Sequence, residues 1–209
     1  MTFRPCLVDR EQGSALIVAL LIALLLGAVG ASLVTLTTTE ILLSASFRQS
    51  QEAAYGADAA LELALHELSL VPDWSLVLAA PPANLTSAFV DGTMQPVGPD
   101  GKVIDLIGLT AGRQRDGDAR DGPGADSPQW RLYAHAPLGD ALGAPRLVPP
   151  LHIVVWVADD REDADGDPTV DRNGTIVVHA EAFGSGGSRR AVEAAIARPP
   201  LRLVSWRRW

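Results

Sequence analysis

A cluster of acidic and amide side chains between residues 159 and 175 is the part of this sequence best suited to chemistry. The segment reads DDREDADGDPTVDRNGT. Carboxylate and amide oxygens are the ligands of hard cations, and Ca²⁺ takes six to eight of them, so the segment predicts a calcium site. Its candidate ligands are Asp163, Asp165, Asp167, Asp171 and Asn173.

The spacing of these residues leaves a second interpretation open. Asp163, Asp165 and Asp167 resemble the start of an EF-hand loop, but Pro168 interrupts it and no glutamate stands at the twelfth position. Asp, Gly, Pro and Asn also form turns, so the segment can be a solvated hairpin loop without a metal. Calcium is the one cofactor we consider, against the alternative of none.

The remaining chemistry-bearing residues do not indicate an enzyme. His152 and His179 fall in neighbouring predicted strands, where ordinary sheet positions explain them and no further zinc ligand can be placed. The sequence contains no Gly-x-Ser-x-Gly, Walker-type or Gly-x-Gly-x-x-Gly signature. We therefore expect a protein without catalytic activity.

The net charge argues against a nucleic-acid partner, and the cysteine count argues against a disulfide. The 209 residues carry a formal net charge of -8, which disfavours nucleic acid because phosphates would be repelled. The nearest basic patch is the C-terminal group of Arg202, Arg207 and Arg208, which we interpret as a solvated tail. The single cysteine, Cys6, excludes an intramolecular disulfide.

The last third of the chain has the pattern of a small antiparallel sheet. Residues 151–159, 175–184 and 188–198 are rich in β-branched and apolar side chains, and a Gly-Ser-Gly-Gly turn separates the last two segments. Residues 102–109 and 130–136 are shorter strand candidates. Residues 113–128 are polar and lack apolar periodicity, so we expect a mobile loop there.

A long apolar segment precedes all of these elements in the chain. No ionisable side chain occurs from residue 14 to 39, which is longer than the roughly 20 residues that cross a bilayer. Arg4 and Arg10 precede the segment and Glu40 follows it, which favours an internal N-terminus. A secretory signal peptide cut near Ala31 and a plain membrane anchor both remain open.

The helical pattern continues beyond the apolar segment. Residues 40–70 lack proline, are rich in Ala and Leu, and end just before Pro72. We therefore predict one helix from about Ser14 to about Ser69, apolar all round at first and amphipathic afterwards, with its second half packed on the sheet in an α+β fold. The expected apolar stripe consists of Phe47, Ala54, Ala57, Leu61, Leu65 and Leu68.

The order of these features resembles a known family. A short leader ending in Gly13, an uninterrupted apolar helix and the run FRQSQEAAYGADAALELAL are similar to the type IV pilins and pseudopilins, most closely to the N-terminal domain of PilX-type minor pilins. The resemblance covers roughly residues 10 to 70. It implies a pilin-like globular domain and cleavage after Gly13 by prepilin peptidase, which leaves Ser14 as the mature N-terminus and the site of methylation.

One position departs from the pattern of the major pilins. They carry a glutamate at the fifth mature residue, thought to neutralise the N-terminal amine of a neighbouring subunit, and this chain has Val18 there. A carboxylate inside a bilayer needs a partner, so its absence changes what the subunit can do during assembly. The resemblance then implies a minor role, at a tip or in priming, rather than the bulk of a fibre.

The resemblance also implies an organisation and a location. Residues 1–13 would be the leader, 14–39 the transmembrane assembly helix, 40–70 its amphipathic continuation and 71–209 a periplasmic globular region. The chain would be a single-pass protein of a bacterial inner membrane, with other pilins or pseudopilins, inner-membrane assembly proteins and prepilin peptidase as partners. The alternatives are a membrane-anchored periplasmic binding domain, Ca²⁺-responsive or not, and a hydrolase behind a signal sequence.

Overall fold

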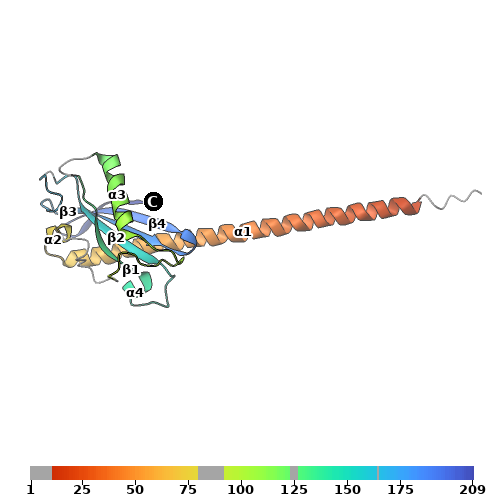
Figure 1. The fold of residues 1–209 in the computed structure, drawn as a ribbon, viewed down its shortest axis with the longest axis horizontal. Helices are drawn as coiled ribbons and strands as arrows, with labels where there is room; N and C mark the ends of the chain where they lie inside the picture. Colours follow the sequence, from red (N-terminus) through yellow and green to blue (C-terminus); the bar gives the residue numbers. More distant parts are fainter. Residues whose placement is uncertain (1–10, 80–91, 123–126, 164) are drawn as a thin grey trace, which may run out of the picture. The chain divides into compact units, whose positions relative to one another are not determined.

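The computed structural model describes residues 11–79, 92–122, 127–163 and 165–209. The proposed leader therefore lies almost wholly outside the described residues. The chain divides into two compact units, Met1–Ala45 and Ser46–Trp209, and each is described by itself. The first contains the apolar part of a long helix, and the second is an α+β unit in which helices cover a five-stranded antiparallel sheet (Figure 1).

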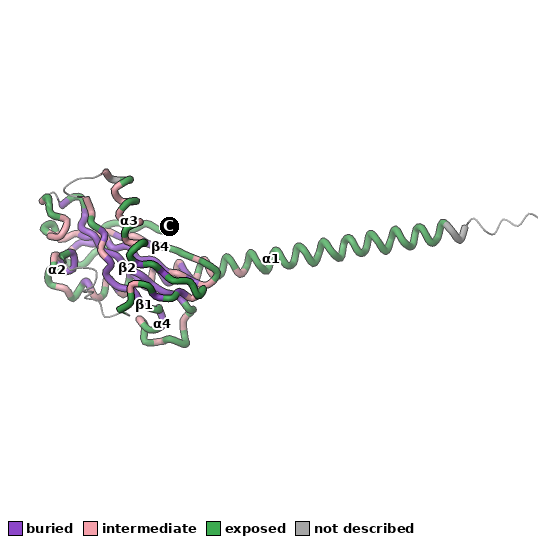
Figure 2. Tube along the Cα trace, viewed as in Figure 1, coloured by how far each residue is buried: buried purple, intermediate pink, exposed green. Residues whose placement is uncertain are grey.

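Helix α1, Glu11–Leu70, confirms the predicted single helix. It contains no proline and ends two residues before Pro72, which cannot continue a helix because its ring fixes φ and removes a backbone donor. Within the first unit every residue from 14 to 44 is exposed (Figure 2), although most of these side chains are apolar. Among the described residues, this is the one helix long and apolar enough to cross a membrane.

The sheet has the strand order β1-β2-β3-β4-β5, with each strand antiparallel to the next. The strands are Arg131–Pro137, His152–Asp159, Thr175–Phe183, Arg189–Ala197 and Arg202–Arg208. The first four confirm the strands predicted at 130–136, 151–159, 175–184 and 188–198. The predicted turn between β3 and β4 is the short 3-10 helix Ser185–Gly187, in which Gly186 and Gly187 adopt the positive φ that glycine tolerates.

The second half of α1 packs on one face of the sheet. Its buried face comprises Ala53, Gly56, Ala57, Ala60, Leu61, Ala64 and Leu68, whereas Phe47 of the predicted stripe is exposed. The opposing side chains, such as Ile153, Val178 and Ile196, are alternate residues of the strands. Small side chains allow this close approach: a Cβ on Gly56 would lie 2.6 Å from Leu151 Cδ1 and 3.1 Å from Ala182 Cβ.

The other face of the sheet is covered by a helix that the sequence did not predict. This helix is α3, Leu106–Asp121, and it includes residues that were predicted as a strand up to 109 and as a loop from 113. Its first turn is capped by Asp105, whose carboxylate accepts from Gly108 N at 3.1 Å. The mobile loop predicted at 113–128 is therefore wrong for residues 113–121, and residues 123–126 lie outside the described part. The strand predicted at 102–109 is wrong from residue 106 onward.

Polar contacts attach α3 to the sheet, which is why hydropathy did not reveal it. Thr110 Oγ1 accepts from Trp156 Nε1 at 2.8 Å, Gln114 Oε1 accepts from Trp130 N at 2.9 Å, and Arg113 lies 3.3 Å from Glu193 Oε2. Only the start of the helix, with Leu106 and Leu109, joins the apolar cluster on this face. A helix held by hydrogen bonds need not have an apolar stripe.

The C-terminal segment is also structured, so the predicted solvated tail is wrong at the backbone level. Residues 202–208 form β5, which pairs with the outer edge of β4 from Val192 to Ala197. The side chains of β5 are all exposed, but the strand provides partners for backbone groups that β4 would otherwise present to water. Arg208 of β5 also lies 2.6 Å from Asp58 of α1. Two short helices, α2 (Ser75–Leu78) and α4 (Leu138–Ala141), complete the unit.

Candidate functional site

The acidic segment is the connection between β2 and β3, and two of its carboxylates hold that connection together. Asp163 is buried, and its Oδ2 accepts from the backbone N–H groups of Arg172 at 2.5 Å and Asn173 at 3.2 Å. Asp171 Oδ1 accepts from Gly174 N at 2.7 Å and Thr175 N at 3.2 Å. These bonds fold the end of the connection back against its beginning.

The cluster of carboxylates that could hold a metal consists of Asp159, Asp163 and Asp171. One oxygen from each of the three lies within 4.8 Å of the others. Asp159 was not among the five predicted ligands, because it is the last residue of β2 and reads as part of a strand. Asp159 could have been identified from its position directly before the loop, because an antiparallel hairpin brings that position close to the start of β3 at Thr175.

The other three predicted ligands lie outside the cluster, so the prediction is corrected for them. Asp165 lies 3.0 Å from Arg172 Nε, and Asp167 is exposed and accepts from the Thr169 hydroxyl at 2.6 Å. Asn173 donates from Nδ2 to Asp160 Oδ1 at 2.8 Å. Their side-chain oxygens serve a salt bridge, a turn and the loop backbone, which is the turn-forming role left open by the sequence.

Burial makes negative charge unfavourable in this cluster. Burial, followed by the nearby Asp163 carboxylate, raises the pKa of Asp159 to about 7, although a hydrogen bond from the backbone of Asp160 opposes the shift. The pKa of Asp171 is also raised by burial, despite the hydrogen bond from Gly174 N and the charge of Arg198. A compact group of carboxylates of this kind favours a proton or a cation.

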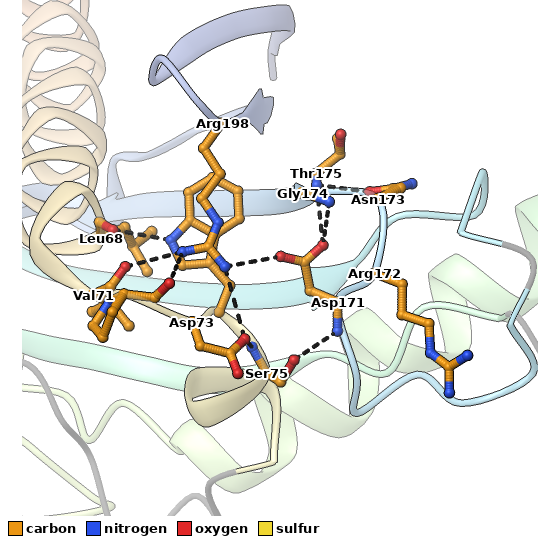
Figure 3. A network of polar contacts seen from close by, with 12 residues as sticks. Leu68, Val71, Asp73, Ser75, Asp171, Arg172, Asn173, Gly174, Thr175 and Arg198 are labelled. Carbon is orange, nitrogen blue, oxygen red and sulfur yellow. Dashed lines mark hydrogen bonds and ion pairs between the residues drawn. The ribbon is translucent and has the colours of Figure 1, made fainter.

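Arg198 connects the cluster to the C-terminal end of α1 (Figure 3). Its Nη1 donates to the carbonyl oxygens of Val71 at 3.1 Å and Pro72 at 2.8 Å, and its Nη2 lies 3.5 Å from Asp171 Oδ2. The guanidinium also lies 4.5 Å from the centre of the Trp74 ring, whose Nε1 donates to Leu68 O at 2.9 Å. One side chain just beyond β4 therefore holds the helix end and the acidic loop together.

His152 and His179, which the sequence placed in neighbouring strands, do not lie beside each other. His152 and His179 do lie on adjacent strands, but the ring close to His152 is His135, with Nδ1 and Nε2 3.4 Å apart. His179 instead packs beside Trp130 and Trp156, with Nδ1 3.4 Å from Glu193 Oε2. Burial lowers the pKa of His179 despite the nearby Glu193 carboxylate.

The predicted processing and assembly residues all lie on α1. Gly13 and Ser14 are inside its first turns, and Val18 is 53% exposed in the apolar part. Five hydroxyl side chains follow in the same part of the helix, and each donates to the carbonyl four residues earlier. They are Ser32, Thr35, Thr37, Thr38 and Thr39. Each bond pairs the hydroxyl with a backbone carbonyl of the same helix.

Comparisons of this chain with family models, with curated proteins and with solved structures return no match. The functional argument therefore rests on the helix, the acidic cluster and the contacts that join them to the sheet.

Proposed function

We propose that this chain is a minor component of a type IV pilus or of a related secretion pseudopilus, acting by helix–helix packing in priming or at the tip. In this proposal the chain resides in a bacterial inner membrane as a single-pass protein before assembly, with the α+β unit in the periplasm. Prepilin peptidase removes the residues up to Gly13. Other pilins or pseudopilins and inner-membrane assembly proteins are its partners.

The continuity of α1 is the observation that carries this proposal. The helix runs from Glu11 through the expected cleavage position to Leu70 without a break, a length of about 90 Å at 1.5 Å per residue. A secretory signal peptide has a shorter apolar region, followed by a small-residue cleavage site. A helix whose second half belongs to the core of the folded unit favours a pilin-like subunit over a removable secretion signal.

The side chains of the first unit support helix packing as its mode of action. Leu16, Leu20 and Leu24 are each more than half exposed, so they need either lipid or neighbouring helices to cover them. Gly27 and Gly30 have nothing within 4 Å of the position a Cβ would take, which leaves room for a close neighbour. Small residues allow helix backbones to approach closely in membranes.

The apolar residue at position 18 supports a minor role. The family's major subunits use a glutamate there to neutralise the N-terminal amine of a neighbour, and Val18 offers no such charge. A subunit without this glutamate does not need a docked neighbour to neutralise it within the bilayer. That property suits a subunit that starts an assembly or occupies its end.

Photo-crosslinking in the native host tests this assembly role. A photoreactive residue at Leu25, which is 65% exposed on α1, should crosslink to one or more proteins that carry a prepilin leader. The matched control is Ile107 on α3, which is 61% exposed and lies outside the proposed assembly helix. Crosslinks from Leu25 to lipid alone, or the same partners from Leu25 and Ile107, would contradict the proposal and favour a plain membrane anchor.

A further inference from the structure

The carboxylates of Asp159, Asp163 and Asp171 come from both ends of the β2–β3 connection and are held in place before any ligand arrives. Asp163 is fixed by two backbone donors at residues 172 and 173, and Asp171 by two at residues 174 and 175. Each of these carboxylates keeps a second oxygen for other contacts. The three groups therefore form a preorganised arrangement, with one oxygen of each within 4.8 Å of the others.

A second observation, on Asp159, points to a ligand at this arrangement. Asp159 is only 3% exposed, and within the part of the chain that the structure describes its Oδ1 has no hydrogen-bond donor. Burying a carboxylate oxygen without a donor is unfavourable, and native structures rarely leave one so. The same carboxylate contributes to the cluster with Asp163 and Asp171, so a ligand bound there would supply the missing partner.

The charges around the cluster fit a divalent cation. Three carboxylates contribute -3, and Arg198, with Nη2 3.5 Å from Asp171 Oδ2, returns +1. The neighbouring Asp160 accepts from Asn173 Nδ2 at 2.8 Å and from Glu162 N at 3.3 Å, which are neutral donors and leave its negative charge in place. The cluster therefore carries an excess of negative charge that a divalent cation would reduce.

We propose that Asp159, Asp163 and Asp171 bind one Ca²⁺ ion. Ca²⁺ accepts protein carboxylates in flexible geometry, whereas Mg²⁺ demands near-ideal octahedral geometry and gives up its waters reluctantly, so a site built from several carboxylates suits Ca²⁺ better. Zn²⁺ prefers nitrogen and sulfur ligands, and the three side chains offer only oxygen. Waters and backbone oxygens complete the six to eight ligands that Ca²⁺ takes.

Ca²⁺ binding at this position would stabilise the C-terminal end of α1 as well as the loop. Asp171 donates from its backbone N to Ser75 Oγ at 3.0 Å, at the start of α2. Its carboxylate faces Arg198, which donates to the carbonyls of Val71 and Pro72 just beyond α1 (Figure 3). Calcium would therefore lock the connection between β2 and β3 onto the end of the long helix.

Calorimetric titration of the full chain in non-ionic detergent, first stripped with EDTA, tests the site. We expect one Ca²⁺ per chain with a Kd of about 10⁻⁴–10⁻³ M, the range of extracellular calcium sites, and a rise in Tm with Ca²⁺. D159N should raise the Kd at least tenfold. D167N changes an exposed carboxylate of the same loop outside the cluster, so it should bind Ca²⁺ like the wild type.

The behaviour of D159N in EDTA separates loss of the site from loss of the fold. Removing a buried, uncompensated charge should leave the Tm of this variant in EDTA equal to or above that of the wild type, while Ca²⁺ no longer raises it. No saturable binding to the wild type at millimolar Ca²⁺ would overturn the proposal. Equal weakening by D159N and D167N would overturn it too, since it would indicate diffuse attraction to an acidic loop.

Discussion

At the scale of single residues, Arg198 is the side chain that joins the acidic loop to the end of α1. It donates to two carbonyls beyond α1, lies over Trp74 and faces a carboxylate whose side chain is 1% exposed. Removing one partner of a buried ion pair leaves the other charge uncompensated, which costs far more than losing a surface pair. The stability of the unit should therefore respond to this position more than to any exposed arginine.

The substitution Arg198→Ala tests this importance. We expect it to lower the free energy of unfolding by about 3 kcal/mol, because Asp171 would keep a buried charge without its counter-ion. Arg198→Lys should recover only part of the loss, since an ammonium cannot reproduce the planar fork of donors. Denaturant unfolding in EDTA measures both variants.

Arg48→Ala is the matched control for Arg198→Ala. Arg48 lies 3.6 Å from Glu52 with its side chain 75% exposed, and such pairs contribute at most about 1 kcal/mol. An effect of Arg198→Ala no larger than that of Arg48→Ala would show that the contacts of Arg198 do not hold the loop and the helix end together.

His179 gives the folded unit a pH dependence that can be measured. Its ring is fully buried among Trp130, Trp156 and Glu193, and burial lowers its pKa below the ordinary 6.5. The unfolded chain therefore binds this proton more readily, so the contribution of His179 to stability should fall as pH drops below 6.5 toward the folded-state pKa. Glu193, whose pKa is lowered by His179, Arg113 and Arg120 against the effect of burial, should matter only below about pH 4.5.

The variant His179→Gln should remove this part of the pH dependence. The measurement is the Tm of both proteins between pH 7.5 and 5, and the Tm of the variant relative to the wild type should rise as the pH falls. Asp159, whose pKa is raised to about 7, changes stability in the opposite direction over this range, but it does so in both proteins and cancels in the comparison. Parallel curves for the two proteins would contradict the assignment to His179. The buried Glu181, which pairs with Arg189 on the same face of the sheet, remains unchanged in both proteins.

Asp159 illustrates how far the sequence predicts the candidate site. The sequence located the acidic loop and two of the clustered carboxylates, Asp163 and Asp171, because Asp-rich turns with cation-ligand spacing are visible locally. It did not identify Asp159, because a strand residue reaches the cluster only through the pairing of β2 with β3. It also could not exclude Asp165 and Asp167, whose other partners are set by the folded loop.

At the scale of elements, the packing of α1 on the sheet depends on a close approach that only glycine allows at residue 56. Gly56→Ala places a methyl group 2.6 Å from Leu151 Cδ1, so the helix or the buried leucine must shift. We expect a net loss of about 1 kcal/mol in unfolding free energy, even after the gain in helix propensity of Ala over Gly.

Gly112→Ala in α3 is the matched control for Gly56→Ala. Its new Cβ would meet only Arg115 Nη2, at 3.9 Å, so the propensity gain should dominate and raise the unfolding free energy by about 0.5–1 kcal/mol. Chemical denaturation of the two variants checks the opposite signs. Stabilisation by Gly56→Ala would contradict the tight contact between α1 and β3.

Among the elements, those with a hydrophobic period were predictable and those held by polar or long-range contacts were not. Helix α1 and strands β1 to β4 follow from apolar patterns in their own residues. Helix α3 is polar along most of its length and is held by partners such as Trp156 and Glu193, far away in the sequence. Strand β5 forms because its backbone pairs with the edge of β4. Its own residues, rich in Arg and Trp, have no apolar alternation that would predict a strand.

At the scale of the whole molecule, the chain combines two kinds of stabilisation. The unit Ser46–Trp209 has its own core, with α1 on one face of the sheet and α3 on the other. Residues 14–44 have no buried side chain, so their apolar surface requires lipid or other helices (Figure 2). A subunit built this way can exchange lipid contacts for helix contacts while its folded unit stays intact, which is the physical basis of the proposed assembly role.

The mass of the mature N-terminus tests the central claim most directly. The protein is purified from host membranes with and without active prepilin peptidase, and its N-terminal peptide is measured by mass spectrometry. The account predicts a chain that begins at Ser14 when the peptidase is active, and an uncut chain in its absence or in the variant Gly13→Leu. Retention of Met1 with active peptidase, or a cut near Ala31, would contradict the pilin-like function.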